Sequence, residues 1–113
     1  MTIEEGSIVE IDIDDVRGRE QRGRRPALVV SVTAFQAIGM AMVCPITTHG
    51  GIASRPRGGL EVALPPGMTV KGMVLVQQVR TIDLDARNAT VLAVCPRATL
   101  LAVRARLKAI LGV

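Results

Sequence analysis

A short arginine-rich segment beside a buried strand holds the side chains best suited to chemistry in this sequence. One carboxylate, Glu20, lies in residues 17–25 together with five guanidinium groups. The five are Arg17, Arg19, Arg22, Arg24 and Arg25. A guanidinium group binds phosphate oxygens through paired hydrogen bonds, and a carboxylate can accept a proton as a general base. The segment is therefore a candidate for acting on a phosphodiester, and a solvated loop with weak ion pairs is the alternative interpretation.

Arg25 differs from the other arginines because it directly precedes Pro26 and the apolar run "PALVVSV" (26–32). A strand in this run would hold the backbone of Arg25 in place and so preorganise its side chain. Thr47, at the end of a later apolar run, offers a hydroxyl donor to a phosphate oxygen. A simple hydrogen bond at the start of a loop is the alternative for Thr47 and Thr48.

The sequence offers few other groups for catalysis. His49 is the only histidine, and no paired Cys or His spacing is present, so we expect no metal site. Cys44 and Cys95 are too few for a disulfide framework. Both are expected to be small buried side chains, with a thiolate favoured by a helix dipole as the alternative for Cys95.

RNA is the phosphodiester that suits such a limited set of groups, because its own 2′-hydroxyl supplies the nucleophile. The protein must then provide a base and fixed positive charge around the pentacovalent phosphorane. Glu20 could be the base if partial burial raises its pKa, although the surrounding arginines would lower that pKa. Arg25 is the natural charge stabiliser, since a guanidinium keeps its proton in proteins and is therefore a poor acid.

The elements that must position these residues are mainly β. Alternating or continuous apolar runs predict strands at 7–14, 26–32, 40–47, 60–64, 73–84 and 89–94. Residues 33–39 form a turn or short helix, and residues 15–25 and 48–59 are predicted loops. Pro45 indicates a bulge or an edge. A helix begins at Pro96 and ends at Gly112, so the order suits a small, strongly bent barrel closed by a terminal helix.

Composition and charge bound what such a protein can be. The 113 residues, 49% of them hydrophobic, are enough for one domain, 1–113, with a real core. The net charge of +4 is compatible with a polyanionic partner. Without Trp or Tyr, and with Phe35 as the only aromatic residue, base-stacking platforms are nearly excluded. No apolar run is long enough for a membrane span and no export signal is visible, so we expect a cytoplasmic protein without membrane contact.

Four sequence blocks, "GREQRGRRPALVVS", "VCPITT", "VLVQQVRTID" and "LKAILG", resemble the successive signature blocks of the MazF/PemK family. They occur in the same order and spacing and cover nearly the whole chain. The resemblance implies an SH3-like small barrel of the MazF/PemK/CcdB type, mainly β with a C-terminal helix. It also implies a homodimeric toxin of a type II toxin–antitoxin system. Such a toxin is a sequence-specific endoribonuclease that cuts single-stranded RNA, chiefly mRNA, without metal or cofactor and leaves 2′,3′-cyclic phosphate and 5′-hydroxyl ends.

The resemblance also assigns roles to particular residues. It implies that Arg25 and Thr47 are catalytic and that Glu20 is the glutamate of the first block. The residues expected to bind RNA are Gln21, Arg19, Arg24, Thr48, Arg55, Arg57, Gln78 and Arg80. The chain departs from many relatives at Gln77, where they carry an acidic residue, and at Ile11 and Ile13, where aromatic residues are common. The base preference of the family is therefore not carried over.

The expected partners follow from the same resemblance. A cognate antitoxin would cover the substrate groove with a disordered acidic tail, and DNA would be contacted only indirectly, through that antitoxin. Two alternatives remain: a non-catalytic nucleic-acid-binding barrel that acts in operon autoregulation, and a gyrase-inhibiting toxin of the same fold.

Overall fold

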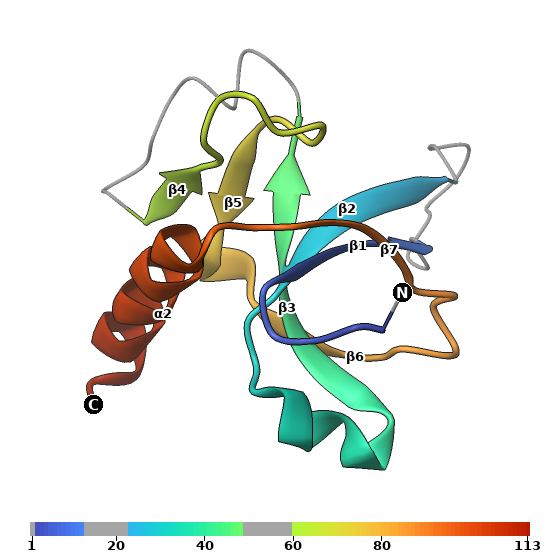
Figure 1. Ribbon diagram of the computed structural model, residues 1–113. Coiled ribbons are helices and arrows are strands. Elements are labelled where there is room, and N and C mark those ends of the chain that lie inside the picture. Colours follow the sequence, from blue (N-terminus) through green and yellow to red (C-terminus); the bar gives the residue numbers. More distant parts are fainter. Residues whose placement is uncertain (1, 13–22, 49–59) are drawn as a thin grey trace, which may run out of the picture.

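The computed structural model describes residues 2–12, 23–48 and 60–113, and it shows a strongly twisted antiparallel sheet with a helix packed beside it (Figure 1). The described strands are β1 Ser7–Asp12, β2 Arg24–Val29, β3 Met40–Thr47, β4 Glu61–Ala63, β5 Met73–Leu75, β6 Arg80–Asp83 and β7 Thr90–Val94. The helices are the 3-10 helices η1 Thr33–Ile38 and η2 Val76–Gln78 and the α-helix α2 Arg97–Leu111. The strand order is β4-β5-β3-β2-β1-β7, with β6 also paired to β3. The predicted mainly β fold with a C-terminal helix is confirmed.

Strand β3 is the centre of the sheet because it has partners along both edges. One edge pairs with β2, where Ala27 faces Pro45. On the other edge Met40–Val43 pair with β6, whereas Ile46 and Thr47 pair with β5. Pro45 lies between these two stretches, where the proline, which has no N–H to donate, interrupts neither ladder.

The change of partner along β3 explains why the predicted single strand 73–84 is wrong. The chain forms β5, turns through η2, and continues as β6. Val76 is fully buried at the start of this turn, while Gln77 and Gln78 are exposed. The apolar run 73–76 ends at these two glutamines, but the change of partner itself depends on the pairing of β3.

Strand β2 begins at Arg24, two residues before the predicted start at Pro26, and this difference matters for the site. Arg24 pairs with Asp12 of β1 and Arg25 pairs with Ile11. Both arginines, assigned from the sequence to the loop 15–25, are therefore part of the sheet. Because side chains alternate along a strand, Arg24 and Arg25 point to opposite faces.

The core has two clusters, one on each face of the central strands. One contains Ile8, Leu28 and Cys44, and the other contains their chain neighbours Val9 and Val29. Burial on both faces explains the continuous apolar runs of the sequence. Helix α2 covers the first cluster with Leu100 and Val103, which are 2% and 0% exposed.

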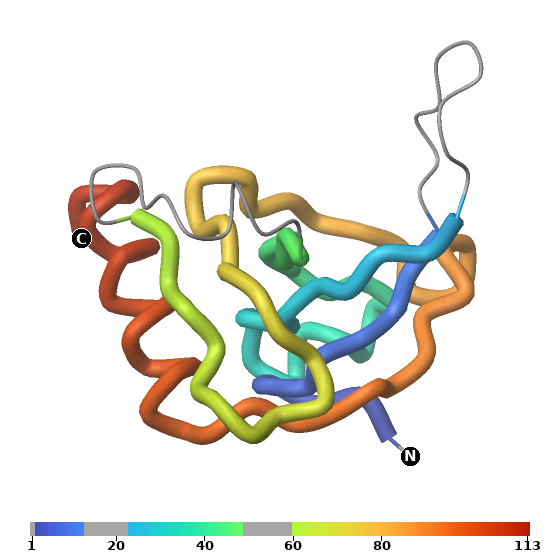
Figure 2. The backbone as a smooth tube through the Cα atoms, turned by 90° about the horizontal axis from the view of Figure 1, so that it is seen from above, coloured from blue at the N-terminus to red at the C-terminus, as the bar shows by residue number. Residues whose placement is uncertain are grey.

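Helix α2 ends where the sequence predicts, since Gly112 has the left-handed φ of 76° typical of a helix C-terminus. Figure 2 shows α2 along one side of the molecule next to β4, and the turn between β6 and β7 on the opposite side. None of the helices in the described part of the chain is long and apolar enough to cross a membrane.

Candidate functional site

Two adjoining surface depressions meet at Arg25 and Pro45, which line both of them. The first lobe has a volume of about 230 Å³ and is lined by Arg25, Pro45, Ile46, Thr47, Thr48 and Leu75. The second lobe has a volume of about 220 Å³ and is lined by Ile11, Asp12, Arg25, Pro26, Ala27, Val43, Pro45, Gln78, Arg80 and Arg87. Together they form a hollow over the end of β1, the start of β2 and the end of β3, and Arg25 lines both of its lobes.

The strand register brings Arg25 and Thr47 to the same lobe. Ala27 pairs with Pro45, and extending this antiparallel register by two residues places Arg25 opposite Thr47 on the same face. Arg25 is exposed and Thr47 is half-buried. The two side chains for which the sequence predicts catalytic roles therefore line one depression of a size that can hold a phosphate group.

The backbone of Thr47 is held in place by close packing against Gly72. This glycine has a φ of 138°, and a Cβ there would overlap the carbonyl oxygen of Thr47. Gly72 also accepts a hydrogen bond from the N–H of Leu64 at 3.0 Å. The turn before β5 thus comes close enough to the end of β3 to position it. Only glycine permits such a close approach at residue 72.

Besides Arg25, four polar or charged residues line the second lobe: Asp12, Gln78, Arg80 and Arg87. Gln78, at the end of η2, and Arg80, at the start of β6, are exposed and were expected to bind RNA. Arg87, in the turn between β6 and β7, is a residue that the sequence reasoning missed. Nη1 of its guanidinium donates a hydrogen bond to the carbonyl oxygen of Asp12 at 3.2 Å. No local sequence signal reveals this placement, because it depends on a contact between residues far apart in the chain.

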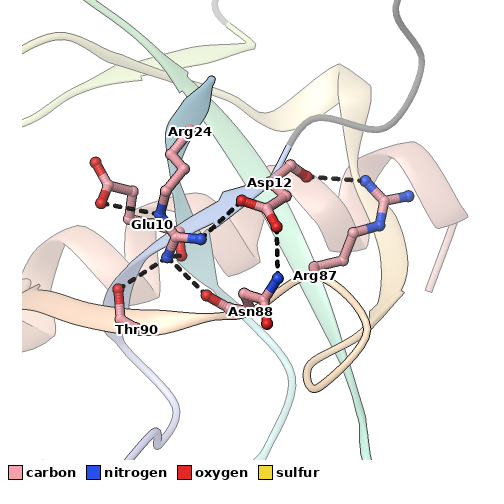
Figure 3. A network of polar contacts seen from close by, with 6 residues as sticks. All are labelled: Glu10, Asp12, Arg24, Arg87, Asn88 and Thr90. Atoms are coloured by element: carbon pink, nitrogen blue, oxygen red, sulfur yellow. Dashed lines mark hydrogen bonds and ion pairs between the residues drawn. The ribbon is translucent and has the colours of Figure 1, made fainter. Parts of the chain in front are cut away.

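Arg24 points to the other face of β2 and is engaged within the protein (Figure 3). Its guanidinium donates to Glu10 Oε1 at 3.1 Å and to Asp12 Oδ1 at 2.8 Å. It also donates to the carbonyl oxygens of Glu10 and Asn88, at 2.8 and 2.6 Å, and to Thr90 Oγ1 at 3.0 Å. These contacts raise the pKa of Arg24, the hydrogen bond to Asp12 first. Arg24 lines neither lobe, and the RNA-binding role expected for it stays a prediction.

Asp12 is the centre of this network. Its carboxylate accepts hydrogen bonds from Asn88 Nδ2 at 2.6 Å and from Arg24. The bond from Asn88, followed by that from Arg24, holds the pKa of Asp12 below its usual value. The carboxylate of Asp12 thus links Arg24 to Asn88, and Asp12 also lines the second lobe.

The departure at Gln77 has a structural counterpart on β4. Gln77 Nε2 donates to Glu61 Oε2 at 2.9 Å, and Glu61 is only 7% exposed. A carboxylate beside η2 is therefore supplied by the neighbouring strand, although Gln77 itself is neutral. Thr48, which the sequence analysis expects to bind RNA, lines the first lobe.

Several predicted site residues lie outside the described residues. They are Arg19, Glu20, Gln21, Arg55 and Arg57, together with His49. Among the residues that the structure does describe, no group of three His, Cys, Asp or Glu side chains could hold a metal ion.

Both cysteines are free and buried. Burial raises the pKa of Cys44 to about 12. Burial also raises the pKa of Cys95, despite its position before α2. The alternative of a dipole-stabilised thiolate at Cys95 is therefore not supported.

Comparisons with known proteins agree with this fold. The family model for the PemK-like, MazF-like toxin of type II toxin–antitoxin systems matches residues 4–111. The endoribonuclease toxin ChpB of Escherichia coli K12 is 46% identical over 87 residues, which are 76% of this chain and 74% of that protein. The endoribonuclease PemK of Escherichia coli is 35% identical over 111 residues, covering 96% and 82% of the two chains.

A solved structure shares the whole architecture. A chain in a MazE–MazF crystal structure from Deinococcus radiodurans superposes with a TM-score of 0.83 at 38% identity, covering 97% of this chain and 96% of the other. The MazF-like fold is thus shared over nearly the full length. The match along the sequence and the agreement in fold show that this chain belongs to the PemK-like, MazF-like toxins of type II toxin–antitoxin systems, a family of endoribonucleases.

Proposed function

We propose that this protein cleaves single-stranded RNA, chiefly mRNA, at specific sequences and without a metal ion. The observation that supports this most is that Arg25 and Thr47 line one depression, where a guanidinium and a hydroxyl can face the same phosphate.

The reaction follows from the chemistry of RNA. The 2′-oxygen attacks the adjacent phosphorus while its proton passes to the carboxylate of Glu20. The new O2′–P bond forms as the P–O5′ bond breaks, and the departing 5′-oxygen takes up a proton from water or from the Glu20 acid formed in the first step. The products are a 2′,3′-cyclic phosphate and a 5′-hydroxyl.

Positive charge and hydrogen bonds at the phosphorane supply most of the rate enhancement. Arg25 compensates the charge that develops on the non-bridging oxygens, and its planar fork fits two of them. Thr47 donates its hydroxyl proton to one of the same oxygens. Gln78 and Arg80 in the second lobe hold the neighbouring nucleotides, and Arg19, Gln21, Thr48, Arg55 and Arg57 extend the RNA-binding surface.

We further infer that a cognate antitoxin inhibits the protein by laying an acidic tail across the two lobes. The guanidinium groups that line them suit carboxylates as well as phosphates. The solved relatives from Deinococcus radiodurans include MazE–MazF complexes. Contact with DNA would be indirect, through this antitoxin.

We also propose a cytoplasmic homodimer, since exposed apolar side chains such as Val94, 62% exposed, and Leu111, 69% exposed, are available for association.

Incubation of the purified protein with a long single-stranded RNA in EDTA tests the activity. We expect discrete fragments whose ends carry a 2′,3′-cyclic phosphate and a 5′-hydroxyl. RNA that binds but stays intact would contradict the proposal in favour of a non-catalytic binding protein. Intact RNA together with inhibited DNA supercoiling would contradict it in favour of a gyrase inhibitor.

The role of Arg25 is tested by Arg25→Ala. Removal of the charge at the phosphorane should lower kcat by roughly 10²- to 10³-fold, as for the loss of one preorganised donor. Arg97→Ala is the matched control, because Arg97 is an exposed arginine at the start of α2 and lines neither lobe. Equal rates for the Arg25 and Arg97 variants would rule out the assignment.

A further inference from the structure

We propose that Arg24 is a positioning residue that holds Arg87 in the second lobe, and this proposal rests on the proposed function. Arg24 and Arg25 are adjacent in β2 but face opposite sides of it. Arg25 faces the substrate hollow, whereas Arg24 faces the ends of β1 and β7. The Arg24 clamp consists of Arg24 and the four residues that accept hydrogen bonds from it, Glu10, Asp12, Asn88 and Thr90 (Figure 3).

The clamp ties β2 to the turn that carries Arg87. Arg24 Nη2 donates to the carbonyl oxygen of Asn88 at 2.6 Å, and its Nη1 donates to Asp12 Oδ1 at 2.8 Å. The other carboxylate oxygen of Asp12 accepts from the Asn88 side chain at 2.6 Å. Asn88 is therefore held at both its backbone and its side chain. Its φ of 51° is a left-handed conformation, which Asn adopts more readily than most residues other than glycine.

Arg87 is hydrogen-bonded to Asp12 through both its backbone and its side chain. The N–H of Asp12 donates to the carbonyl oxygen of Arg87 at 2.9 Å, and Arg87 Nη1 donates to the carbonyl oxygen of Asp12 at 3.2 Å. Arg87 is thus fixed between Asp12 on one side and the held Asn88 on the other. From this position it lines the second lobe together with Arg25 and Arg80.

Loss of Arg24 should displace this turn without unfolding it. Glu10 and Asp12 lie on one face of β1, and without the guanidinium between them their like charges repel. The carbonyl oxygen of Asn88 loses its charged donor at the same time. The turn keeps its local hydrogen bonds, from Arg87 N–H to Asp83 and from Asn88 N–H to Asp85. We therefore expect a folded protein in which Arg87 is less well placed toward substrate.

The test is a double-mutant cycle with Arg24→Gln and Arg87→Gln, measured as kcat and KM for cleavage of one defined RNA. Arg24→Gln should raise KM roughly tenfold, with a smaller effect on kcat, as expected for weakening a charge-assisted contact to phosphate. In the Arg87→Gln background the same change should have little further effect, because both residues act through one contact.

Arg104→Gln provides a matched control for a purely structural effect. Arg104 is also half-buried and also donates to a carboxylate and a backbone carbonyl, those of Glu5 and Val30, at 2.6 and 3.0 Å. It lines neither lobe. This variant should lose stability yet keep the KM of the wild type. If Arg24→Gln raised KM by the same factor with and without Arg87, the positioning role would be wrong.

A measurement without RNA separates this proposal from the proposed function. In ¹H–¹⁵N spectra, Arg24→Gln should shift the backbone signal of Asn88 and the Nε signal of Arg87, and Arg104→Gln should leave both unchanged. Unaltered signals in the Arg24 variant would overturn the clamp, whatever the activity. A wild-type protein that leaves RNA intact would refute the proposed function, and the spectra would still decide whether Arg24 positions Arg87.

Discussion

Arg24 and Arg25, two successive residues of β2, show how the position of a residue in a strand determines what its side chain contacts. Arg25 extends the row of side chains that runs through Ala27 and Val29, and it emerges where that row leaves the core and enters the hollow. Arg24 lies on the other face and is engaged by two carboxylates. Composition alone treats them alike, whereas the period of two residues along the strand separates them.

At the same scale, Gly72 is predicted to be required for the placement of Thr47. Gly72→Ala should lower both stability and kcat, because its Cβ overlaps the carbonyl oxygen of Thr47 and must displace it. Gly67→Ala is the control, since Gly67 also has a positive φ, 91°, but a Cβ there would have no atom within 4 Å. Both variants incur a backbone cost on the order of 1–3 kcal/mol from placing Ala at a positive φ, measured by urea unfolding. Equal cleavage rates per folded molecule in the two variants would contradict this role of Gly72.

The site residues that could be predicted from sequence are those within continuous motifs. Arg25 before Pro26, and Thr47 at the end of an apolar run, are recognisable from their neighbours in the chain. Arg87 is different, because its partner Asp12 lies in a strand that precedes it by 75 positions. Contacts of this kind arise only once β1 and the turn after β6 are brought together by the sheet.

At the scale of elements, the Arg24 clamp joins the ends of β1, β2 and the turn before β7 through charged contacts. The strands themselves were predictable where their apolar pattern is unbroken: β3 has the predicted bounds, and β7 differs by one residue. The predicted strand 73–84 was wrong because β3 offers two separate pairing stretches. No local propensity reports on such a change of partner.

The clamp should make part of the stability depend on pH, and the sign follows from Asp12. Its pKa is lowered from the ordinary value of 3.8, so the folded state favours the ionised carboxylate. The stabilisation is fully present above that ordinary value and is lost as the pH falls through the lowered pKa. Asp12→Asn should therefore be less stable than the wild type at pH 6, with a smaller difference near pH 2. Urea unfolding across this range measures it, and a difference that stays constant with pH would refute the prediction.

At the scale of the whole molecule, the net charge of +4 attracts a polyanion, but the placement of the charges decides where it binds. Exposed arginines occur both in the second lobe and far from it. Arg80 lines the lobe, whereas Arg97 is at the start of α2. A single substitution at either residue changes the net charge by the same amount, so the pair separates general attraction from local contact.

Arg80→Gln should therefore weaken RNA binding more than Arg97→Gln, although both variants lose one positive charge. A phosphate contact in single-stranded RNA contributes a slope of about −0.7 to the dependence of log K on log salt concentration. We expect Arg80→Gln to reduce the slope by roughly that amount and Arg97→Gln to leave it nearly unchanged. Fluorescence anisotropy with a 2′-deoxy-substituted oligonucleotide, which cannot be cleaved by 2′-oxygen attack, measures binding alone. Identical slopes in the two variants would mean that RNA is held by the overall charge of the protein and not by the second lobe.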